Sequence, residues 1–212
     1  FLDILTRLNE RLLEGRPRLG EITWRENAPG FEMARVRLKF GARLGPDDLF
    51  LARFDPAKYA FQPYHESEFP ESNPTALSGW AERFPEAAAL INGGQYYPNR
   101  SPMGTLTRNG LELSETTHPQ WKGFLASQPA EAAPPGAPLA TIIDTQPSGR
   151  LRPEGYRDVI QSFMLLDQYG LIRVRDSHNL AGRSAVGQDR EGRVILIMTP
   201  SAMTLYDLAL AL

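Results

Sequence analysis

Apolar and polar residues alternate over much of the chain, and this alternation predicts strands more often than helices. In the segment 31–40, the residues Ala34, Val36, Leu38 and Phe40 are apolar, and charged residues stand between them. This two-residue period predicts a strand with one face in solvent. Short apolar runs between turn residues predict further strands at 48–56, 58–66, 140–144, 158–167, 170–175, 183–189 and 193–199. The last third of the chain is therefore expected to be dense in strands.

A few segments have helical spacing instead. Leucines three or four residues apart predict an amphipathic helix at 1–14. A capped helix closed by Pro85 is expected in the middle of the chain, and a buried strand at 87–91 should follow it. The chain then ends in a helix that begins at Ser201 or Thr204, with an apolar stripe along it.

These elements together predict the fold class. Asn109-Gly110 between apolar runs predicts a tight hairpin, and the Pro- and Ala-rich segment 127–138 predicts a loop. Many strands, a few helices and no regular βαβ alternation predict an α+β fold with mixed or largely antiparallel sheets and flanking helices. We divide the chain into an N-terminal helix or edge segment, 1–20, and one domain, 21–212.

Composition narrows the class of protein. The chain has 212 residues and a formal net charge of -2, which suits one globular domain and lacks the basic excess of a general nucleic-acid binder. It contains no cysteine, which excludes thiol catalysis, cysteine zinc sites and disulfides. No apolar span is long enough for a transmembrane helix. The three histidines form no HExxH motif, so no cofactor is predicted, and a divalent metal held by carboxylates stays open.

The segment "INGGQYYPNRSPMGTLTRNG", residues 91–110, contains the first candidate chemistry. An apolar run ends there in Asn92, Gly93 and Gly94, just before two tyrosines. Paired glycines let another group approach the backbone closely and present N–H groups to an anion. Asn92 adds a donor and an acceptor. A tight turn explains the same residues without a ligand, so both interpretations stay open.

Other polar residues also allow two interpretations. Arg183 opens a predicted strand after a glycine, and arginine suits two-point binding of phosphate. A surface arginine at the start of a strand fits the same pattern. Gln161 and Ser162 interrupt an apolar strand, so they are either hydrogen-bonded in the core or face a pocket. His65 and His178 lie in loop-like segments, where surface histidines are the simpler interpretation.

The order of the segments adds information that no single motif gives. The segments "FLARFDPAKYAFQPYHE", "LSGWAERFPEAAALINGG", "SPMGTL", "VIQSFMLL", "RSAVGQDREGRVILIMT" and "MTLYDLALAL" follow one another along the chain. This succession resembles the phosphodiester glycosidase domain family, which includes the enzyme that uncovers mannose-6-phosphate tags and bacterial exopolysaccharide-biosynthesis relatives. The resemblance runs from about Leu49 to the C-terminus. Its most specific parts are "INGG", "SPMG", "IQS" and "GRSAVGQD".

The resemblance implies a hydrolase that cleaves the bond between a sugar and a phosphodiester. In that family the Asn-Gly-Gly segment and the arginine of the "RSAVG"-like strand lie at the proposed active site. By this similarity Asn92 and Arg183 are the expected catalytic residues, with Arg183 on the phosphate. The expected substrate-binding residues are Gly93, Gly94, Tyr96, Gln161, Ser162 and Ser184. A guanidinium and backbone N–H groups suit a phosphodiester anion, and a tyrosine can stack on a sugar ring.

The chain departs from the family pattern at several positions. Gln95 replaces the usual apolar or aromatic residue, and Phe163-Met164 replaces the usual Gly-Pro. The family has a Leu-Asp-Gly-Gly-type segment soon after its last helix, and this sequence stops at Leu212, so either a C-terminal part with that segment is not included here or this protein lacks the segment. The aspartate of that segment is the family's leading acid–base candidate. The carboxylates near the corresponding elements here are Asp144, Asp167 and Asp207.

Two other functions stay open. A non-catalytic glycan- or phosphate-binding domain in exopolysaccharide processing would keep the pocket without acid–base chemistry. A structural or assembly protein for exported polysaccharide would need no pocket. The expected partner is a carbohydrate phosphodiester, with no nucleic acid and no membrane span. The resemblance implies an extracytoplasmic location, periplasmic or secreted, and the sequence does not indicate an oligomeric state.

Overall fold

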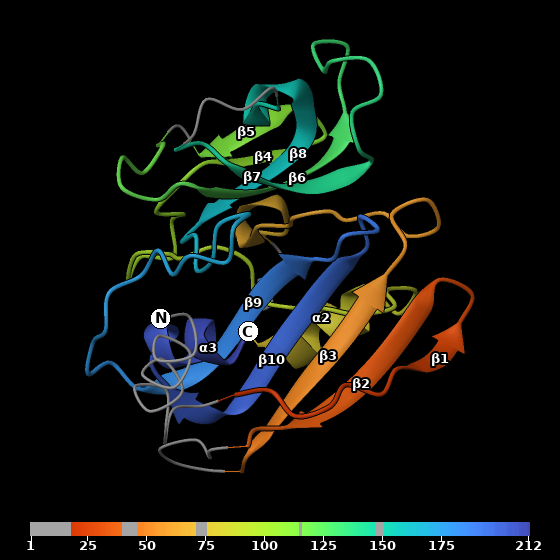
Figure 1. Ribbon diagram of the computed structural model, residues 1–212. Coiled ribbons are helices and arrows are strands. Elements are labelled where there is room, and N and C mark those ends of the chain that lie inside the picture. Colours follow the sequence, from red (N-terminus) through yellow and green to blue (C-terminus); the bar gives the residue numbers. More distant parts are fainter. Residues whose placement is uncertain (1–17, 40–45, 71–75, 115, 147–150) are drawn as a thin grey trace, which may run out of the picture.

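Two antiparallel β-sheets, lying one above the other, make up most of the structure (Figure 1). The computed structural model describes residues 18–39, 46–70, 76–114, 116–146 and 151–212. The helix predicted at 1–14 lies outside these ranges. Each sheet has five strands within the described part of the chain. No helix in that part is long and apolar enough to cross a membrane.

The first sheet, the lower one in Figure 1, has the strand order β1-β2-β3-β10-β9. Its strands are β1 (Arg25–Ala28), β2 (Phe31–Arg37), β3 (Asp48–Phe54), β9 (Ala181–Gln188) and β10 (Val194–Met203). In its middle, Leu51 of β3 stands between Ala34 and Ile197 of the neighbouring strands. The alternation predicted from residue 34 on is confirmed, because Ala34, Val36 and Leu38 are buried and Arg35 and Arg37 between them are exposed.

The second sheet, with the order β5-β4-β8-β6-β7, is built from the middle of the chain. Its strands are β4 (Leu106–Arg108), β5 (Leu111–Ser114), β6 (Gly123–Pro129), β7 (Ala140–Asp144) and β8 (Tyr156–Ser162). The hairpin predicted at Asn109-Gly110 is confirmed. The two residues have φ of 52° and 79°, in the left-handed region that a two-residue hairpin turn requires. The loop predicted at 127–138 starts later, because β6 continues to Pro129.

The fold is mostly β, so the predicted α+β class with flanking helices is wrong. The described residues contain two α-helices, α2 (Leu77–Arg83) and α3 (Leu205–Ala211), and two 3-10 turns, η1 (Glu66–Glu68) and η2 (Pro153–Gly155). Helix α2 ends at its cap, Phe84, because Pro85 has no N–H to continue it. The predicted buried strand at 87–91 is irregular and largely exposed. Its alanines lack the branched and aromatic side chains that favour strands.

Two further predicted strands are also irregular. The backbone of the segment 58–66 is not paired in a sheet, but its aromatic side chains pack on the first sheet. Tyr59 and Phe61 lie edge-on against Phe54, with centroid distances of 5.2 and 6.2 Å. The segment 170–175 forms an isolated bridge between Leu166 and Ile172. Both apolar runs are partly buried as the pattern indicates, but a strand also requires a neighbouring backbone to pair with.

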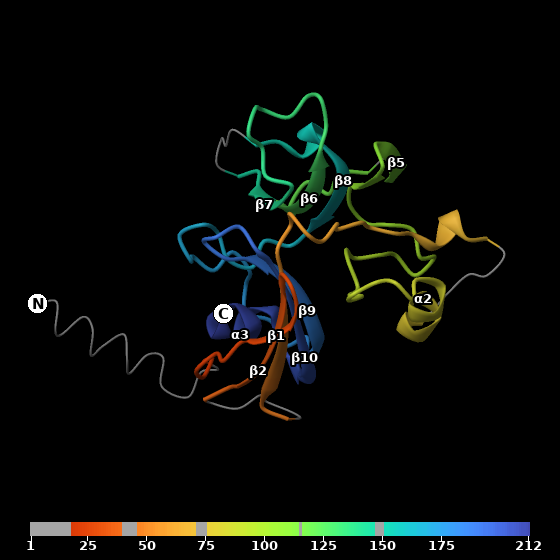
Figure 2. The same ribbon diagram turned by 90° about the vertical axis from the view of Figure 1, so that its right-hand side faces the viewer.

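The core of the first sheet lies on the side of α3. Figure 2 shows α3 and α2 on opposite sides of this sheet. Leu208 of α3 is 0% exposed and packs with Met203 and Leu49 in one apolar cluster. The helix starts at Thr204, one of the two predicted positions. The Thr204 hydroxyl accepts from Asp207 N (3.0 Å), and the Asp207 carboxylate accepts from Thr204 N (3.4 Å), which completes a capping box.

Gln188, at the end of β9, connects the two sheets. Its Oε1 accepts from Thr141 Oγ1 (3.1 Å) and Ile142 N (3.3 Å) of β7. Its Nε2 donates to Ala140 O (3.1 Å) and, on its own side, to Gly192 O (2.9 Å). One side chain therefore bonds to β7 of the second sheet and to the turn that joins β9 and β10 of the first, and it helps to set the relative position of the two sheets.

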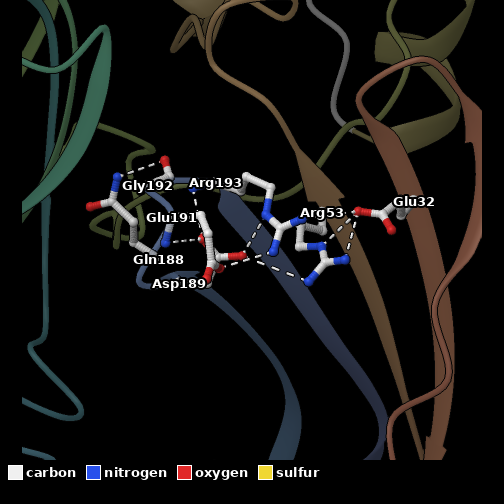
Figure 3. A network of polar contacts seen from close by, with 7 residues as sticks. All are labelled: Glu32, Arg53, Gln188, Asp189, Glu191, Gly192 and Arg193. Atoms are coloured by element: carbon white, nitrogen blue, oxygen red, sulfur yellow. Dashed lines mark hydrogen bonds and ion pairs between the residues drawn. The ribbon is translucent and has the colours of Figure 1, made fainter.

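An ionic network beside Gln188 holds the turn between β9 and β10 (Figure 3). Asp189 accepts from Arg193 Nε at 2.7 Å and lies 3.7 Å from Arg53 Nη1. Arg53 also pairs with Glu32 at 2.7 Å, and its guanidinium lies 4.1 Å from the centroid of the Trp24 ring. The network links the turn to strands β2 and β3.

Replacing Gln188 with alanine is expected to lower the free energy of unfolding by about 1–3 kcal/mol, because polar groups of β7 lose their partner. Arg190 lies on the same turn and is exposed. The free energy of unfolding of Arg190→Ala should therefore differ from that of the wild type by no more than about 0.5 kcal/mol. Denaturant unfolding of both variants measures the difference. Wild-type stability in Gln188→Ala would contradict its role as a connection between the sheets.

Candidate functional site

A cavity of about 1800 Å³ lies among the two sheets and the segment 76–96. Pockets for small ligands usually measure about 300–1,000 Å³, so this one has room for an extended ligand. The predicted site residues on its wall are Asn92, Gly93, Gly94, Tyr96, Gln161, Ser162 and Ser184. Arg183 is the one predicted site residue that does not line it among the residues described. The structure therefore gathers most of the predicted site around one cavity.

The two glycines allow the segment after Asn92 to lie directly on strand β8. A Cβ atom at Gly93 would come within 2.4 Å of Ile160 Cδ1, and one at Gly94 within 3.0 Å of the Gln161 carbonyl oxygen. Neither glycine has a positive φ. Close packing on the protein's own strand, and not turn geometry, is thus what requires glycine here. Asn92 and Gly93 remain exposed on the cavity wall.

The Gln161 amide is fully occupied by backbone groups. The residue is 1% exposed. Its Oε1 accepts from Thr105 N (3.0 Å) and His118 N (2.8 Å), and its Nε2 donates to His118 O (2.9 Å) and Trp121 O (2.8 Å). Two N–H donors and two acceptor lone pairs are all that an amide has. Of the two interpretations, core hydrogen bonding describes Gln161, and its side chain has no group left for a substrate.

Two serines present hydroxyl groups to the cavity. Ser162 donates from Oγ to Gln95 Oε1 at 3.3 Å, which joins the end of β8 to the segment after the glycines. Ser184 pairs across the sheet with Met198. Its neighbour Ala185 packs against the core cluster on the α3 side, and successive strand residues face opposite sides. Ser184 therefore faces away from α3.

Arg183 faces α3, on the opposite side of β9 from Ser184. Its Nε donates to Met203 O (3.0 Å), and its Nη2 donates to Asn179 O (2.5 Å). Burial lowers the pKa of the guanidinium, although an arginine stays charged at neutral pH. In this arrangement Arg183 holds the end of β10 and the segment before β9. To make the predicted contact with a phosphate in the cavity, the Arg183 side chain would have to break its hydrogen bonds to both backbone carbonyls.

The cavity wall continues from the glycines into a hairpin at 95–103. Hydrogen bonds from Tyr97 N to Ser101 O and from Met103 N to Gln95 O, both 2.9 Å, close this hairpin. Tyr96 is 67% exposed and lines the cavity. Its ring is available for stacking, as the interpretation of Tyr96 as a sugar contact requires.

The sequence pattern missed three polar residues on the same wall, His65, Glu66 and Arg100. Arg100 Nη1 pairs with Glu66 at 2.8 Å, and His65 Nε2 lies 3.1 Å from Arg100 O. The residues come from segments far apart in the sequence, and no local period indicates that they meet. Their charges were visible in the sequence, but their position on the cavity was not.

The carboxylates near the predicted site differ in their surroundings. Asp207 caps α3. Asp144 lies on the cavity wall at the end of β7, where Oδ1 accepts from Gln146 N (2.9 Å). Its buried Oδ2 has no hydrogen-bond partner among the described residues. Within the same residues, no group of three or more His, Asp and Glu side chains could hold a metal ion.

Asp167 is expected to stabilise the fold only as a carboxylate. Hydrogen bonds from Leu171 N (3.0 Å) and Tyr169 N (2.9 Å) and the Arg173 guanidinium hold its pKa below the ordinary value. This contribution is present above the unfolded-state pKa of about 3.9 and is lost as the pH falls through the lower folded-state pKa. Asp167→Asn should therefore destabilise the protein at pH 7 and show a smaller loss of stability on acidification to about pH 3. Unfolding measured at several pH values checks this, and equal pH dependence would contradict it.

Comparison with known proteins agrees with the motifs. No curated protein matches the chain. A family model described as phosphodiester glycosidase matches residues 85–212. The matched region is more than half of the chain, and it contains every predicted site residue and all five strands of the second sheet. The resemblance is thereby confirmed over 85–212, although the match starts later than the expected Leu49, and the chain belongs to the phosphodiester glycosidase family.

Proposed function

We propose that this protein hydrolyses the bond between a sugar and a phosphodiester in an extracytoplasmic glycan or glycoconjugate. The observation that carries the proposal is that the region shared with the family, 85–212, forms much of the cavity wall. That wall contains Asn92 and the two glycines, together with the hydroxyl groups of Ser162 and Ser184. The periplasmic or secreted location is part of the proposal and follows from the family resemblance.

The reaction defines what the wall must supply. Water attacks the anomeric carbon, and the bond from that carbon to the phosphate oxygen breaks. The oxygen keeps the electron pair, so the products are a free sugar and a phosphate monoester, and one proton from the water is released. Negative charge grows on the leaving phosphate, where N–H donors stabilise it. Asn92 donates and accepts hydrogen bonds to orient the substrate, and Tyr96 stacks on the sugar.

The second candidate is a glycan- or phosphate-binding domain without catalysis. Among the predicted site residues that line the cavity, the side chains of Asn92, Ser162 and Ser184 are uncharged amide or hydroxyl groups. Such groups recognise a ligand by hydrogen bonds, but they are not acids or bases at neutral pH. This observation favours binding, and a turnover assay separates it from hydrolysis.

The test uses the full-length gene product and a panel of sugar 1-phosphodiesters, with added divalent metal or with EDTA. We expect release of free sugar and at least a tenfold loss of kcat/KM in Asn92→Ala. Asn179→Ala is the matched control, because Asn179 contributes its backbone carbonyl and does not line the cavity. Saturable binding without release would establish the binding domain instead. Neither release nor binding would refute both functions.

A further inference from the structure

Arg100 is a guanidinium on the wall of the proposed active-site cavity. Its side chain is 46% exposed, and it follows Asn92 and Tyr96 on the same wall. Arg183, which the family resemblance places on the phosphate, instead donates to two backbone carbonyls on the α3 side of β9. The structure therefore offers a different arginine to a ligand in this cavity.

The backbone of Arg100 has an unfavourable conformation that its neighbours maintain. Its φ is 69°, in the left-handed region that residues with a Cβ atom rarely adopt. Arg100 N donates to Tyr97 O at 2.7 Å inside the hairpin. Strained residues of this kind persist where the surrounding structure fixes them, and they concentrate at ligand-binding sites.

Two residues at the start of η1 hold Arg100 from outside the hairpin. Glu66 accepts from Arg100 Nη1 at 2.8 Å. Ser67 N donates to His65 Nδ1 at 3.2 Å, so Nδ1 is an acceptor and the proton lies on Nε2. Nε2 then donates to Arg100 O at 3.1 Å. His65 thus fixes the backbone of Arg100, and Glu66 fixes its side chain.

The 3-10 turn η1 is itself anchored to the second sheet. Glu68 accepts from His65 N at 2.9 Å through Oε2 and pairs with Arg108 of β4 through Oε1. The Arg108 guanidinium lies 4.1 Å from the centroid of the Tyr64 ring. The guanidinium of Arg100 is therefore positioned before any ligand binds, which is the condition for efficient recognition of a charge.

We infer that Arg100 contacts the phosphate of the substrate, and that His65 and Glu66 are its positioning residues. The inference rests on the proposed function, because the phosphodiester is the anion that the cavity would receive. A phosphodiester carries one negative charge on two unesterified oxygens, and the planar fork of a guanidinium matches that pair. The same wall then contacts the sugar through Tyr96 and the phosphate through Arg100.

Calorimetric titration of the full-length protein with a C-glycosyl analogue of a hexose 1-(methyl phosphate) tests the phosphate contact apart from turnover. In this analogue a CH₂ group replaces the oxygen between the sugar and the phosphorus, so the bond that the proposed reaction breaks is absent. Arg100→Ala and Arg100→Gln are both expected to weaken binding about 10- to 100-fold, the effect of losing a charge-assisted hydrogen bond. Arg183→Lys should retain wild-type affinity. Arg83→Ala is the matched control, because Arg83 lies over the Phe69 ring and does not line the cavity. Thermal unfolding of each variant shows whether a loss of binding reflects a loss of fold.

Steady-state kinetics test the positioning role of His65. His65→Ala should raise KM several-fold with little change in kcat, because it releases the backbone of Arg100. His65→Gln should restore KM, since its amide can donate near the place of Nε2. Equal KM in His65→Ala and the wild type would overturn this role.

The outcomes separate the inference from the function on which it rests. Full binding by both Arg100 variants, or loss of binding in Arg183→Lys alone, would overturn the inference while wild-type hydrolysis continues. A wild-type protein that neither binds nor hydrolyses the phosphodiester would refute the proposed function, and the inference with it. Loss of binding confined to folded Arg100 variants would establish the contact.

Discussion

Gln161→Leu is expected to lower the free energy of unfolding by about 3–5 kcal/mol, a large effect for one substitution. Leucine has a similar volume but cannot satisfy the backbone groups of Thr105, His118 and Trp121 that the amide now binds. These groups lie around a side chain that is 1% exposed, so water replaces the lost bonds poorly. Denaturant unfolding followed by circular dichroism measures the change.

Gln95→Leu is the matched control for this substitution. Gln95 is half-buried beside the same strand, and its side chain accepts from Ser162 at 3.3 Å. We expect a loss of less than about 1 kcal/mol for this variant. Comparable stability of the two variants would show that the Gln161 network does not hold the second sheet together.

Local patterns predicted the parts of the fold that local interactions determine. The hairpin at Asn109-Gly110 needs two residues with positive φ, and the helix after Thr204 needs a side-chain cap. Both requirements produce a sequence pattern that spans only a few residues. The number of sheets and the pairing of their strands produce no such local pattern, because β3 pairs with β10, which comes from the far end of the chain. The apolar segment 58–66 was therefore predicted as a strand, although it pairs with no strand in the described part of the chain.

The candidate site shows the same limit. The two glycines led us to expect a ligand close to the backbone, and in the structure the groups beside them belong to β8, Ile160 at Gly93 and the Gln161 carbonyl at Gly94. Gln161 read equally well as a core or a pocket residue, and only its four backbone partners distinguish the two. His65 and Arg100 meet across two loops, and such a contact has no period or motif. Single residues were predictable as polar or apolar, whereas their partners were not.

Gly94→Ala is expected to lower hydrolysis roughly tenfold, with a smaller effect in Gly93→Ala. A Cβ at Gly94 would stand 3.0 Å from the backbone oxygen of Gln161, which lies within the second sheet and cannot move aside. The segment would have to rise from β8 and carry Asn92 with it. The segment has to shift by only a few tenths of an ångström. Since a misplacement of about 1 Å can reduce a rate about 100-fold, the expected loss is roughly tenfold.

At Gly93 the obstacle is different. The added Cβ would meet Cδ1 of Ile160, the end of a flexible side chain that can rotate away. Measurement of kcat/KM and of unfolding for both variants checks the contrast. The prediction requires a large loss of activity in Gly94→Ala while that protein stays folded. Full activity in Gly94→Ala would mean that the distance between Asn92 and β8 does not matter for the reaction. The reverse order, with Gly93→Ala the weaker enzyme, would show that Ile160 cannot yield and that the cavity wall is fixed by its apolar side chains.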